Sequence, residues 1–509
     1  MPLFTWLRAQ LANEPKPAAR RPLPRLGLQQ LEAREVPTVG LLSAFGVGSA
    51  ADRSIARDIA VDAAGNSYLT GLFGGTVDFD PTGTHPGDTD ILTAAGGTDA
   101  FVAKYAPDNS LVWAKRMGGS TSEATDSGQS IDVDGAGNVY VTGQFRGTAD
   151  FGSTTLTAAG SGGHDGFVTK FDAGGSFVWA NRWGLADNST SIKGERGSAV
   201  DTDAAGNVYV LGTRTSDNGA AFHGYDILKY NSDGTPAWAK FIGSSEAPVG
   251  GDLATDAGGS VFVTGTFNGL VDFDPNSGTK LVSSGLGVYS GFVLKLTSAG
   301  NFGWISPFVG QSQTVGGVTT YGSSSSNRLV LDGSGNVIVG GFYNGKVDFD
   351  PGRGTTSLPT GGGMFITKLN SAGGFVWARA LEDRSAQRTF SFIQGLAVDS
   401  AGSVYATGSL AGSVDFDPGS GTRNLTSAGG TDAFVVKLTS TGNFGWAESF
   451  GGAGDEVGWG IAVHPSGTVH LAGSYASLAV DFDPDLTGTF NLTNPGTYRN
   501  IFLVKLRQN

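Results

Sequence analysis

The sequence predicts an all-β fold, a seven-bladed β-propeller of four-stranded antiparallel blades, on three observations. A unit of four short strands recurs seven times between about Ser43 and the C-terminus. Glycine accounts for 82 of 509 residues, more than twice its average share of roughly 7%, and it separates runs rich in Val, Phe, Tyr and Thr. The repeat is also circularly offset, which a closed ring requires and an open solenoid does not.

The first two strands of each unit flank an Asp-x-x-Gly-Asn-type turn, and the second strand ends in Thr-Gly. Apolar residues alternate on both sides of the turn, which indicates a β-hairpin, and Asn and Gly tolerate the positive φ that tight turns need. The seven copies occupy residues 59–71, 131–143, 199–212, 253–265, 329–341, 396–408 and 461–473.

The third strand follows the pattern Phe-Val-x-Lys-Leu, and the fourth carries a Trp after a short turn that contains Gly. The third strands occupy residues 101–105, 167–171, 227–230, 292–296, 365–369, 434–438 and 502–506. The Trp residues of the fourth strands are Trp113, Trp179, Trp238, Trp304, Trp377 and Trp446.

Only six Trp strands follow the seven third strands, because the sequence ends just after the last of them. The missing strand is predicted at the other end, where residues 41–48 align with the Trp strands and place Ser43 at the Trp position. One N-terminal strand and three C-terminal strands then complete the last blade, which removes the exposed sheet edges of an open array.

The D-x-x-G-N-x-Y-V-T-G turn and the F-V-x-K-L and V-W-A strands resemble the SBBP β-propeller repeat family of bacterial surface proteins. The resemblance covers residues 41–507. It implies the propeller fold and a place at the cell surface, and it says little about activity.

Residues 1–38 differ from the predicted propeller domain, residues 39–509. They hold six of the 19 prolines and no strand pattern, so we expect a disordered or weakly helical leader. Residues 24–39 resemble the "LExRxxP" leader of large planctomycete proteins, which implies an exported, cell-surface or extracellular protein of a bacterium. The alternative is an amphipathic linker.

The charge and composition exclude several classes of protein. The net charge is −13, and residues 1–38 carry +3, so the predicted propeller carries −16 and would repel nucleic acid. The absence of Cys excludes disulfides and thiolate metal sites. No run of 18 apolar residues occurs, so the sequence predicts no transmembrane segment. We expect a monomer.

The predicted propeller has two unequal faces. The turn between the first and second strands and the turn between the third and fourth are short and share one face. The other two connections are long and irregular, and they share the opposite face. Because loops carry function on rigid scaffolds, we expect a protein or glycan ligand on the long-loop face, around the mouth of the axial channel.

The motif Val-Asp-Phe-Asp-Pro recurs in five units. We interpret it as a structural turn in which Phe is buried and Pro ends the strand. The alternative is a Ca²⁺ site, because Ca²⁺ prefers oxygen ligands and the paired carboxylates share one side of a strand. The candidate metal ligands are Asp78, Asp80, Asp272, Asp274, Asp348, Asp350, Asp415, Asp417, Asp481 and Asp483. No other cofactor is indicated.

A Lys recurs in every third strand and an Asp in six of the seven hairpin turns. Both lie near the short-turn face, so we predict a partly buried Lys–Asp pair in each blade, with a structural role. The residues are Asp62, Lys104, Asp134, Lys170, Asp203, Lys229, Asp256, Lys295, Asp332, Lys368, Asp399, Lys437 and Lys505, and His464 replaces the Asp of the last unit.

The Trp residues of the fourth strands hold a fixed place in their strands, which favours packing between blades over ligand contact. Trp183 and Trp459 lie outside this pattern and near loops, so they are the candidate carbohydrate contacts.

No catalytic residue is assigned. The five His residues show no metal-ligand spacing, and no Gly-x-Ser-x-Gly elbow occurs. The leading hypothesis is therefore a non-enzymatic surface propeller that binds a protein or a glycan. One alternative is a polysaccharide hydrolase or lyase that uses loop carboxylates, which would need two acids about 5–10 Å apart in a deep cleft. Another is a structural spacer of the cell envelope.

Overall fold

The computed structural model describes most of the chain beyond the predicted leader, which itself lies outside the described residues. Pro37–Asn509 is one compact unit. The described residues are 39–508 except 51, 81–82, 84–89, 122–124, 160–162, 185–191, 217–222, 245–249, 286–287, 353, 384–390, 485–487 and 495.

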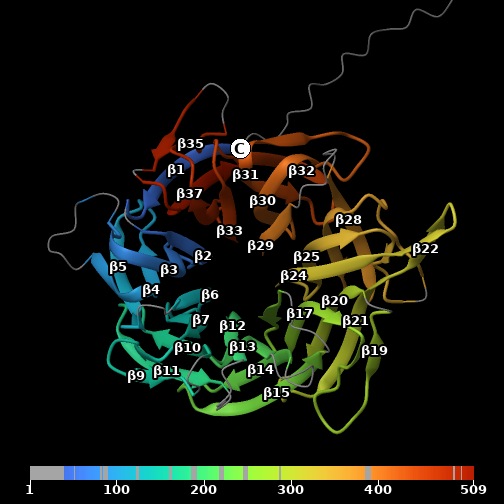
Figure 1. Cartoon of the computed structure of the whole chain (residues 1–509), viewed down its shortest axis with the longest axis horizontal. Helices are drawn as coiled ribbons and strands as arrows, with labels where there is room; N and C mark the ends of the chain where they lie inside the picture. Colours follow the sequence, from blue (N-terminus) through green and yellow to red (C-terminus); the bar gives the residue numbers. More distant parts are fainter. Residues whose placement is uncertain are drawn as a thin grey trace, which may run out of the picture. The chain divides into compact units, whose positions relative to one another are not determined.

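The described residues form seven blades of four antiparallel strands, named a to d from the ring axis outward (Figure 1). In the order a, b, c, d, the blades are β2 (Ser54–Val61), β3 (Ser67–Asp78), β4 (Ile91–Tyr105) and β5 (Leu111–Gly119); β6 (Ser127–Val133), β7 (Val139–Phe145), β10 (Asp165–Phe171) and β11 (Phe177–Trp183); β12 (Ile192–Thr202), β13 (Val208–Ser216), β14 (His223–Tyr230) and β15 (Pro236–Ser244); β16 (Asp252–Thr255), β17 (Val261–Asn268), β20 (Tyr289–Leu296) and β21 (Phe302–Gly310); β24 (Ser323–Leu331), β25 (Val337–Asn344), β27 (Gly363–Leu369) and β28 (Phe375–Asp383); β29 (Phe392–Val398), β30 (Val404–Asp415), β31 (Asn424–Leu438) and β32 (Phe444–Phe450); and β33 (Glu456–Val463), β34 (Val469–Tyr475), β37 (Asn500–Gln508) and β1 (Val39–Val47).

The ring closes through the last blade, as the circular offset of the repeat predicts. The N-terminal strand β1 pairs antiparallel with the C-terminal strand β37. Ser43 lies opposite Lys505, the place that Trp113 takes opposite Lys104 in the first blade, so the predicted alignment is confirmed. The strand runs from Val39 to Val47 rather than from about 41 to 48. The innermost strand β2 contacts both β6 and β33, its two neighbours around the axis.

Smaller strands lie outside the blades, and some of them join one blade to the next. The strands β8, β26 and the end of β30 pair with the d strands β5, β21 and β28 of the preceding blades. Their bounds, with those of the remaining short strands, are β8 (Thr148–Asp150), β9 (Thr155–Thr157), β18 (Leu270–Asp272), β19 (Leu281–Ser283), β22 (Ser312–Val315), β23 (Val318–Tyr321), β26 (Val347–Asp348), β35 (Ala479–Asp481) and β36 (Asn491–Thr493).

The hydrophobic core lies between the blades as well as within them. One buried cluster contains Phe79 and Phe101 of the first blade together with Phe45 and Ile501 of the last. The Trp residues of the d strands add a second contact between blades. Trp113 packs on the turn between the c and d strands of the next blade, and its Nε1 donates to the carbonyl of Ala173 at 3.4 Å. Only Gly fits at the neighbouring position 175, where φ is 80° and an added Cβ would strike the Trp113 ring.

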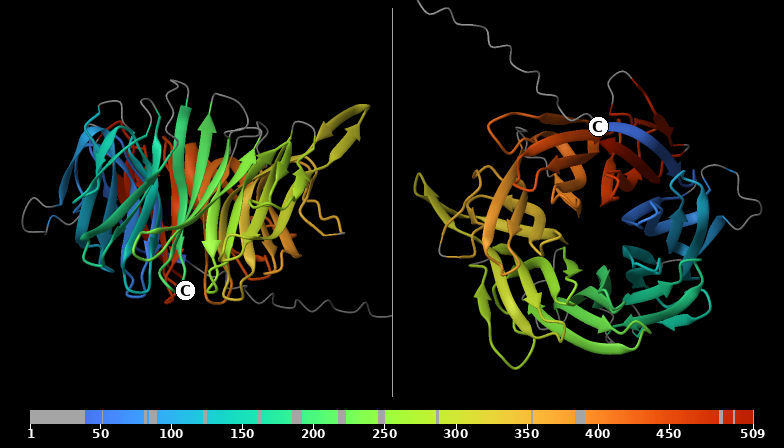
Figure 2. Two further views of the ribbon diagram at one scale, coloured as in Figure 1. Left: turned by 90° about the horizontal axis from the view of Figure 1, so that it is seen from below. Right: turned by 180° about the vertical axis from the view of Figure 1, so that it is seen from behind.

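The two ends of the ring differ in their connections, as the side view in Figure 2 shows. The a–b turns are held by side chains: Asp134 Oδ1 accepts the backbone N–H groups of Ala136 and Asn138, each at 2.9 Å, and its Oδ2 accepts Asn138 Nδ2 and Tyr140 Oη at 2.7 and 2.9 Å. Because both carboxylate oxygens of Asp134 are engaged within its own hairpin, the role of this recurring Asp is structural. No helix in the described part of the chain is long and apolar enough to cross a membrane.

Candidate binding site at the ring axis

The Val-Asp-Phe-Asp-Pro motifs have the structure of a turn. Phe349 is buried against Phe365, with ring centroids 4.8 Å apart. Asp348 Oδ1 accepts the N–H groups of Asp350 and Thr356, both at 3.0 Å, and so closes the loop that follows. The first Asp of the other motifs likewise accepts the N–H of the second. Among the described residues, no three carboxylate or imidazole side chains converge in a way that could hold a metal.

The recurring Lys and Asp residues form ion pairs in only three blades of the described structure. The joined atoms are Lys368 Nζ and Asp332 Oδ2 at 2.8 Å, Lys295 Nζ and Asp256 Oδ2 at 3.5 Å, and Lys437 Nζ and Asp399 Oδ2 at 4.0 Å. The prediction of a pair in every blade does not hold for the first three blades.

The residue that follows the turn accounts for much of the difference. In the first three blades it is a Tyr whose hydroxyl donates to the turn Asp, as Tyr68 does to Asp62 at 2.9 Å, and Lys104 Nζ lies over the Tyr68 ring, 5.0 Å from its centroid. Phe262 and Ile338 have no hydroxyl to donate, so Lys takes the carboxylate in those blades.

In the sixth blade Tyr405 Oη also donates to Asp399 Oδ2, at 2.9 Å, and Lys437 Nζ stays 4.0 Å from that oxygen, the longest of the three ion pairs. In the last blade Lys505 donates to the carbonyls of residues 106 and 107, and burial lowers its pKa to about 8.

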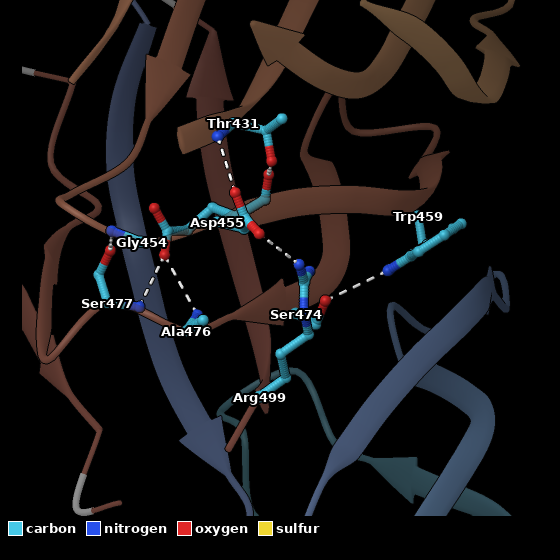
Figure 3. Close-up of polar contacts among 9 residues, drawn as sticks. Thr431, Gly454, Asp455, Trp459, Ser474, Ala476, Ser477 and Arg499 are labelled. Atoms are coloured by element: carbon cyan, nitrogen blue, oxygen red, sulfur yellow. Dashed lines mark hydrogen bonds and ion pairs between the residues drawn. The ribbon is translucent and has the colours of Figure 1, made fainter. Parts of the chain in front are cut away.

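The two candidate Trp residues differ in their surroundings. Trp183 is half-buried in β11, and it packs with the core cluster of Val208 and Val210 in the next blade. Trp459 lies in the innermost strand β33, with its Nε1 donating to Ser474 Oγ at 3.2 Å (Figure 3). The structure therefore places Trp459, and not Trp183, on a strand that borders the axis.

Trp459 belongs to a ring of residues that interrupt the innermost strands. Six of the seven a strands contain a β-bulge at the same place in their pairing with the b strand. In the first blade, for example, the bulge lies between Ala56, which pairs with Gly71, and Asp58, which pairs with Thr70. A bulge inserts one unpaired residue and redirects a side chain, and bulges are common next to functional sites. These six residues, called the bulge ring below, are Arg57, Gln129, Ser198, Asn327, Gln394 and Trp459.

A cavity of about 280 Å³ lies directly below the bulge ring, and all seven a strands line it. Its wall is acidic on the side of the first four blades, where Asp58, Asp132, Asp201 and Asp252 lie. On the side of the last two blades it is formed by Leu396, Ile461 and Gly395. Arg328 of the fifth blade also lines the cavity, so its wall holds four acidic residues and one basic residue beside an apolar part.

The two cavity carboxylates nearer to the bulge ring, Asp58 and Asp252, accept hydrogen bonds from backbone groups of the next blade. Asp58 Oδ2 accepts the N–H of Ile131 at 3.0 Å, and Asp252 Oδ2 accepts that of Leu329 at 2.9 Å. An innermost strand has a free edge, and these bonds satisfy its N–H groups. Burial raises the pKa of Asp58 to about 6, although hydrogen bonds and the charge of Arg328 oppose the rise.

The two cavity carboxylates farther from the bulge ring, Asp132 and Asp201, are the pair of acids that most resembles a catalytic pair. Burial, and then the charge of Asp132, raise the pKa of Asp201 to about 8. Burial also raises the pKa of Asp132. Both accept hydrogen bonds from the next blade: Thr202 Oγ1 donates to Asp132 Oδ2 at 2.6 Å, and the N–H and Oγ1 of Thr255 donate to Asp201 Oδ2 at 2.6 and 2.9 Å.

At the bulge ring itself the charges are positive. The Arg57 guanidinium lies over the Trp459 ring, 4.3 Å from its centroid, and its buried Nε has no hydrogen-bond partner. Burial, followed by the charges of Arg196, Arg53, Arg328 and Arg499, lowers the pKa of Arg57 to about 10. Of these neighbours, Arg499 is paired with Asp455 at 2.9 Å (Figure 3).

The bulge ring was not predicted from the sequence. The alternation of apolar residues begins one or two positions after each bulge, at Ile59 and Ile131 for example, so the hairpin pattern does not include the residue that faces the axis. The positions on either side of each bulge residue also vary between units, so the sequence around it gives no repeating signal.

The strand pairing and the closed ring define the chain as a seven-bladed β-propeller in its described part. Residues 112–144, which run from the second residue of β5 through β6 to the next-to-last residue of β7, match the model of the SBBP family, described as a beta-propeller repeat. The predicted resemblance to that family is confirmed over this segment.

Two curated proteins are similar in sequence. An uncharacterized WD repeat-containing protein of Acanthamoeba polyphaga mimivirus is 23% identical over 482 residues, which covers 76% of this chain and 33% of that protein. The regulatory protein FlaEY of Caulobacter vibrioides is 24% identical over 409 residues, which covers 75% of this chain and 39% of that protein. The chain thus spans about a third of the length of these relatives.

Among solved structures, a protein of unknown function from Dyadobacter fermentans aligns with 93% of this chain and all of its own length, at 10% identity and a TM-score of 0.39. The WD40 domain of Neurospora crassa Pan2 aligns with 74% of this chain and 88% of its own, at 10% identity and a TM-score of 0.37.

Proposed function

We propose that the protein is a non-enzymatic binding propeller, exported or held at the cell surface, that recognises a protein or glycan ligand at the axis of its long-loop face. The observation that carries this proposal is the bulge ring. It sets five different residue types at one equivalent position of six blades, around a single axis.

The chemistry of the bulge ring suits recognition. It combines an aromatic ring, three amide side chains, a hydroxyl and a guanidinium, and Ser198 Oγ is buried without a hydrogen-bond partner. Buried polar groups are normally paired, so an unpaired one next to a cavity favours a ligand that pairs it. The axial cavity of about 280 Å³ is near the lower limit of small-ligand sites, which is roughly 300 Å³.

An enzyme acting on polysaccharide is the second candidate, because Asp132 and Asp201 influence each other at the axis. Their hydrogen bonds favour a structural role instead. Both carboxylates accept hydrogen bonds from Thr side chains of the next blade, so they join blades as Asp58 does one layer higher.

A matched pair of Trp variants tests the binding proposal. Wild type, Trp459→Ala and Trp183→Ala would be screened on a glycan array and in protein pull-downs. We expect wild type to retain a ligand, Trp459→Ala to lose it by about tenfold or more because an anchoring aromatic is removed, and Trp183→Ala to bind normally with a lower melting temperature. Equal loss in both variants, or hydrolysis of a glycan that depends on Asp201, would contradict the proposal.

A further inference from the structure

Three Arg residues from alternate blades lie on innermost strands at or beside the bulge ring. Arg57 is one of its residues, Arg196 lies two residues before Ser198, and Arg328 directly follows Asn327 and lines the axial cavity. Arg57 comes from the first blade, Arg196 from the third and Arg328 from the fifth. Arg196 and Arg328 both act on the charge of Arg57, and Arg328 acts on that of Arg196. Such influence requires proximity, so residues far apart in the sequence gather their positive charges in one place within a chain of net charge −13.

These guanidinium groups lack the carboxylate partners that other Arg residues of the ring have. Arg116, Arg182 and Arg214 each pair with a buried Asp of their own blade at 2.6 to 2.8 Å. Within the described residues, no ion pair involves Arg57, Arg196 or Arg328. Arg328 donates to the backbone carbonyls of Gln394 and Asn327.

The nearby carboxylates are already engaged. Asp58 accepts the N–H groups of Ile59 and Ile131, and Asp252 accepts those of Leu253 and Leu329. Asp58 and Asp252 therefore offset part of the positive charge of the three Arg residues without forming an ion pair with any of them in the described structure. Like charges that repel each other and stay unpaired destabilise a fold, and departures of this kind from ordinary packing concentrate at functional sites.

We propose that Arg57, Arg196 and Arg328 form a seat for the oxyanion of an acidic sugar, a carboxylate or a sulfate, at the mouth of the axial cavity. Guanidinium groups bind such oxyanions through paired, charge-assisted hydrogen bonds. The amide and hydroxyl side chains of the bulge ring favour a sugar over an acidic peptide, because Gln129, Ser198 and Gln394 offer neutral partners for several hydroxyl groups.

The identification of the ligand as a sugar rests on the proposed binding function, whereas the oxyanion seat can be tested without it. The first probe is sodium sulfate alone, with the melting temperature compared against sodium chloride at equal ionic strength. Because sulfate stabilises folded proteins in general, the informative quantity is the difference between the two proteins. We expect sulfate to raise the melting temperature of wild type more than that of Arg196→Gln, whose side chain is exposed and whose replacement leaves the core intact. An equal rise in the melting temperatures of wild type and Arg196→Gln would overturn the seat.

The second probe is oligogalacturonate, measured by calorimetry beside a neutral oligosaccharide and poly-glutamate. We expect oligogalacturonate to bind, more weakly at high salt, and each of Arg57→Gln, Arg196→Gln and Arg328→Gln to weaken it between about tenfold and a hundredfold. Arg423→Gln, which removes an ion pair with Glu448 on the outer strand of the sixth blade, is the control and should bind as wild type does.

The outcomes separate the two proposals. Binding of poly-glutamate but not of oligogalacturonate would overturn the sugar assignment. Binding of a neutral glycan, unaffected by the Arg variants, would overturn the seat and leave the binding propeller standing. A structural role for Arg196 would show as a lower melting temperature of unliganded Arg196→Gln, whereas the seat predicts no decrease, because the substitution relieves repulsion.

Discussion

The two ends of the inner strands follow opposite rules. At the a–b turns six blades carry the same Asp, and its oxygens are engaged within the turn, by the Tyr that follows it or by the Lys of the third strand, as Asp134, Asp256 and Asp332 show. At the bulge ring, a few residues away on the same strands, the side chain changes from blade to blade, and two polar atoms are buried without partners. The difference teaches that recurrence in this chain marks architecture, and that function is to be sought where the repeat breaks.

The largest expected effect comes from crowding the constant part of a blade. Gly71 lies in the Thr-Gly end of a b strand, where an added Cβ would lie 1.9 Å from the backbone oxygen of Ile55. We expect Gly71→Ala to lower the free energy of unfolding by about 3 kcal/mol, since overpacked backbone cannot relax. Chemical denaturation measures this. Gly135→Ala, where a Cβ meets nothing within 4 Å, is the control and should be nearly neutral.

The next effect sharpens the comparison among blades. Lys368 and Asp332 form a nearly buried ion pair, with 8% and 7% of their side chains exposed. Lys368→Met should therefore destabilise the protein by about 3 kcal/mol, because it leaves a buried carboxylate unpaired. Lys104→Met removes only a contact with a Tyr ring and a weak bond to a carbonyl, and should cost under about 1 kcal/mol. Equal losses in denaturation would show that Tyr68 does not replace the ion pair.

A third prediction concerns the pH dependence of the cavity carboxylates. The pKa of Asp201 is raised to about 8 in the folded chain, so the folded state holds its proton more tightly than the unfolded state does. The contribution of Asp201 to stability is therefore complete below pH 4 and is lost as the pH rises through 8. The difference in melting temperature between Asp201→Asn and wild type should shift in favour of the variant from pH 5 to pH 8. A difference that is constant over this range contradicts the pKa shift.

The smallest effect is expected from chelation. The first Asp of each Val-Asp-Phe-Asp-Pro motif is engaged by backbone N–H groups, so EDTA should leave the melting temperature unchanged within about 1 °C. A decrease of several degrees that Ca²⁺ restores would revive these residues as metal ligands.

The fold could be predicted because each of its determinants repeats. Seven copies of one hairpin, six Trp strands and Ser43 in the place of the seventh are enough to give the number of blades and the closure of the ring. The a–b turn was equally accessible, because Asp and Gly in a short turn have few structural alternatives.

The sequence predicts Trp459 and a site at the mouth of the axial channel, whereas the rest of the candidate site could not be predicted, because it depends on contacts between blades. Asp58 reaches the N–H of Ile131, 73 residues away, only when two inner strands lie side by side. A bulge adds one residue without changing the apolar alternation that follows it, so Trp459 and Arg57 gave no sign of meeting. Among the described side chains, the Lys–Asp pairs are absent from the first three blades for a subtler reason, since a Tyr hydroxyl donates to the carboxylate there. In the sixth blade Tyr405 does the same, and the Lys437–Asp399 pair is 4.0 Å long.

The most direct test compares ligand binding after one change at each end of the same inner strand. Trp459→Ala alters the bulge ring at β33. His464→Ala alters the turn at the other end of that strand, where the half-buried His464 forms hydrogen bonds with Ser466 and with the carbonyl of Ala63. Measured against the ligand retained by wild type, the account predicts at least about tenfold weaker binding for Trp459→Ala and unchanged binding for His464→Ala. The reverse result would place recognition on the short-turn face and contradict the account.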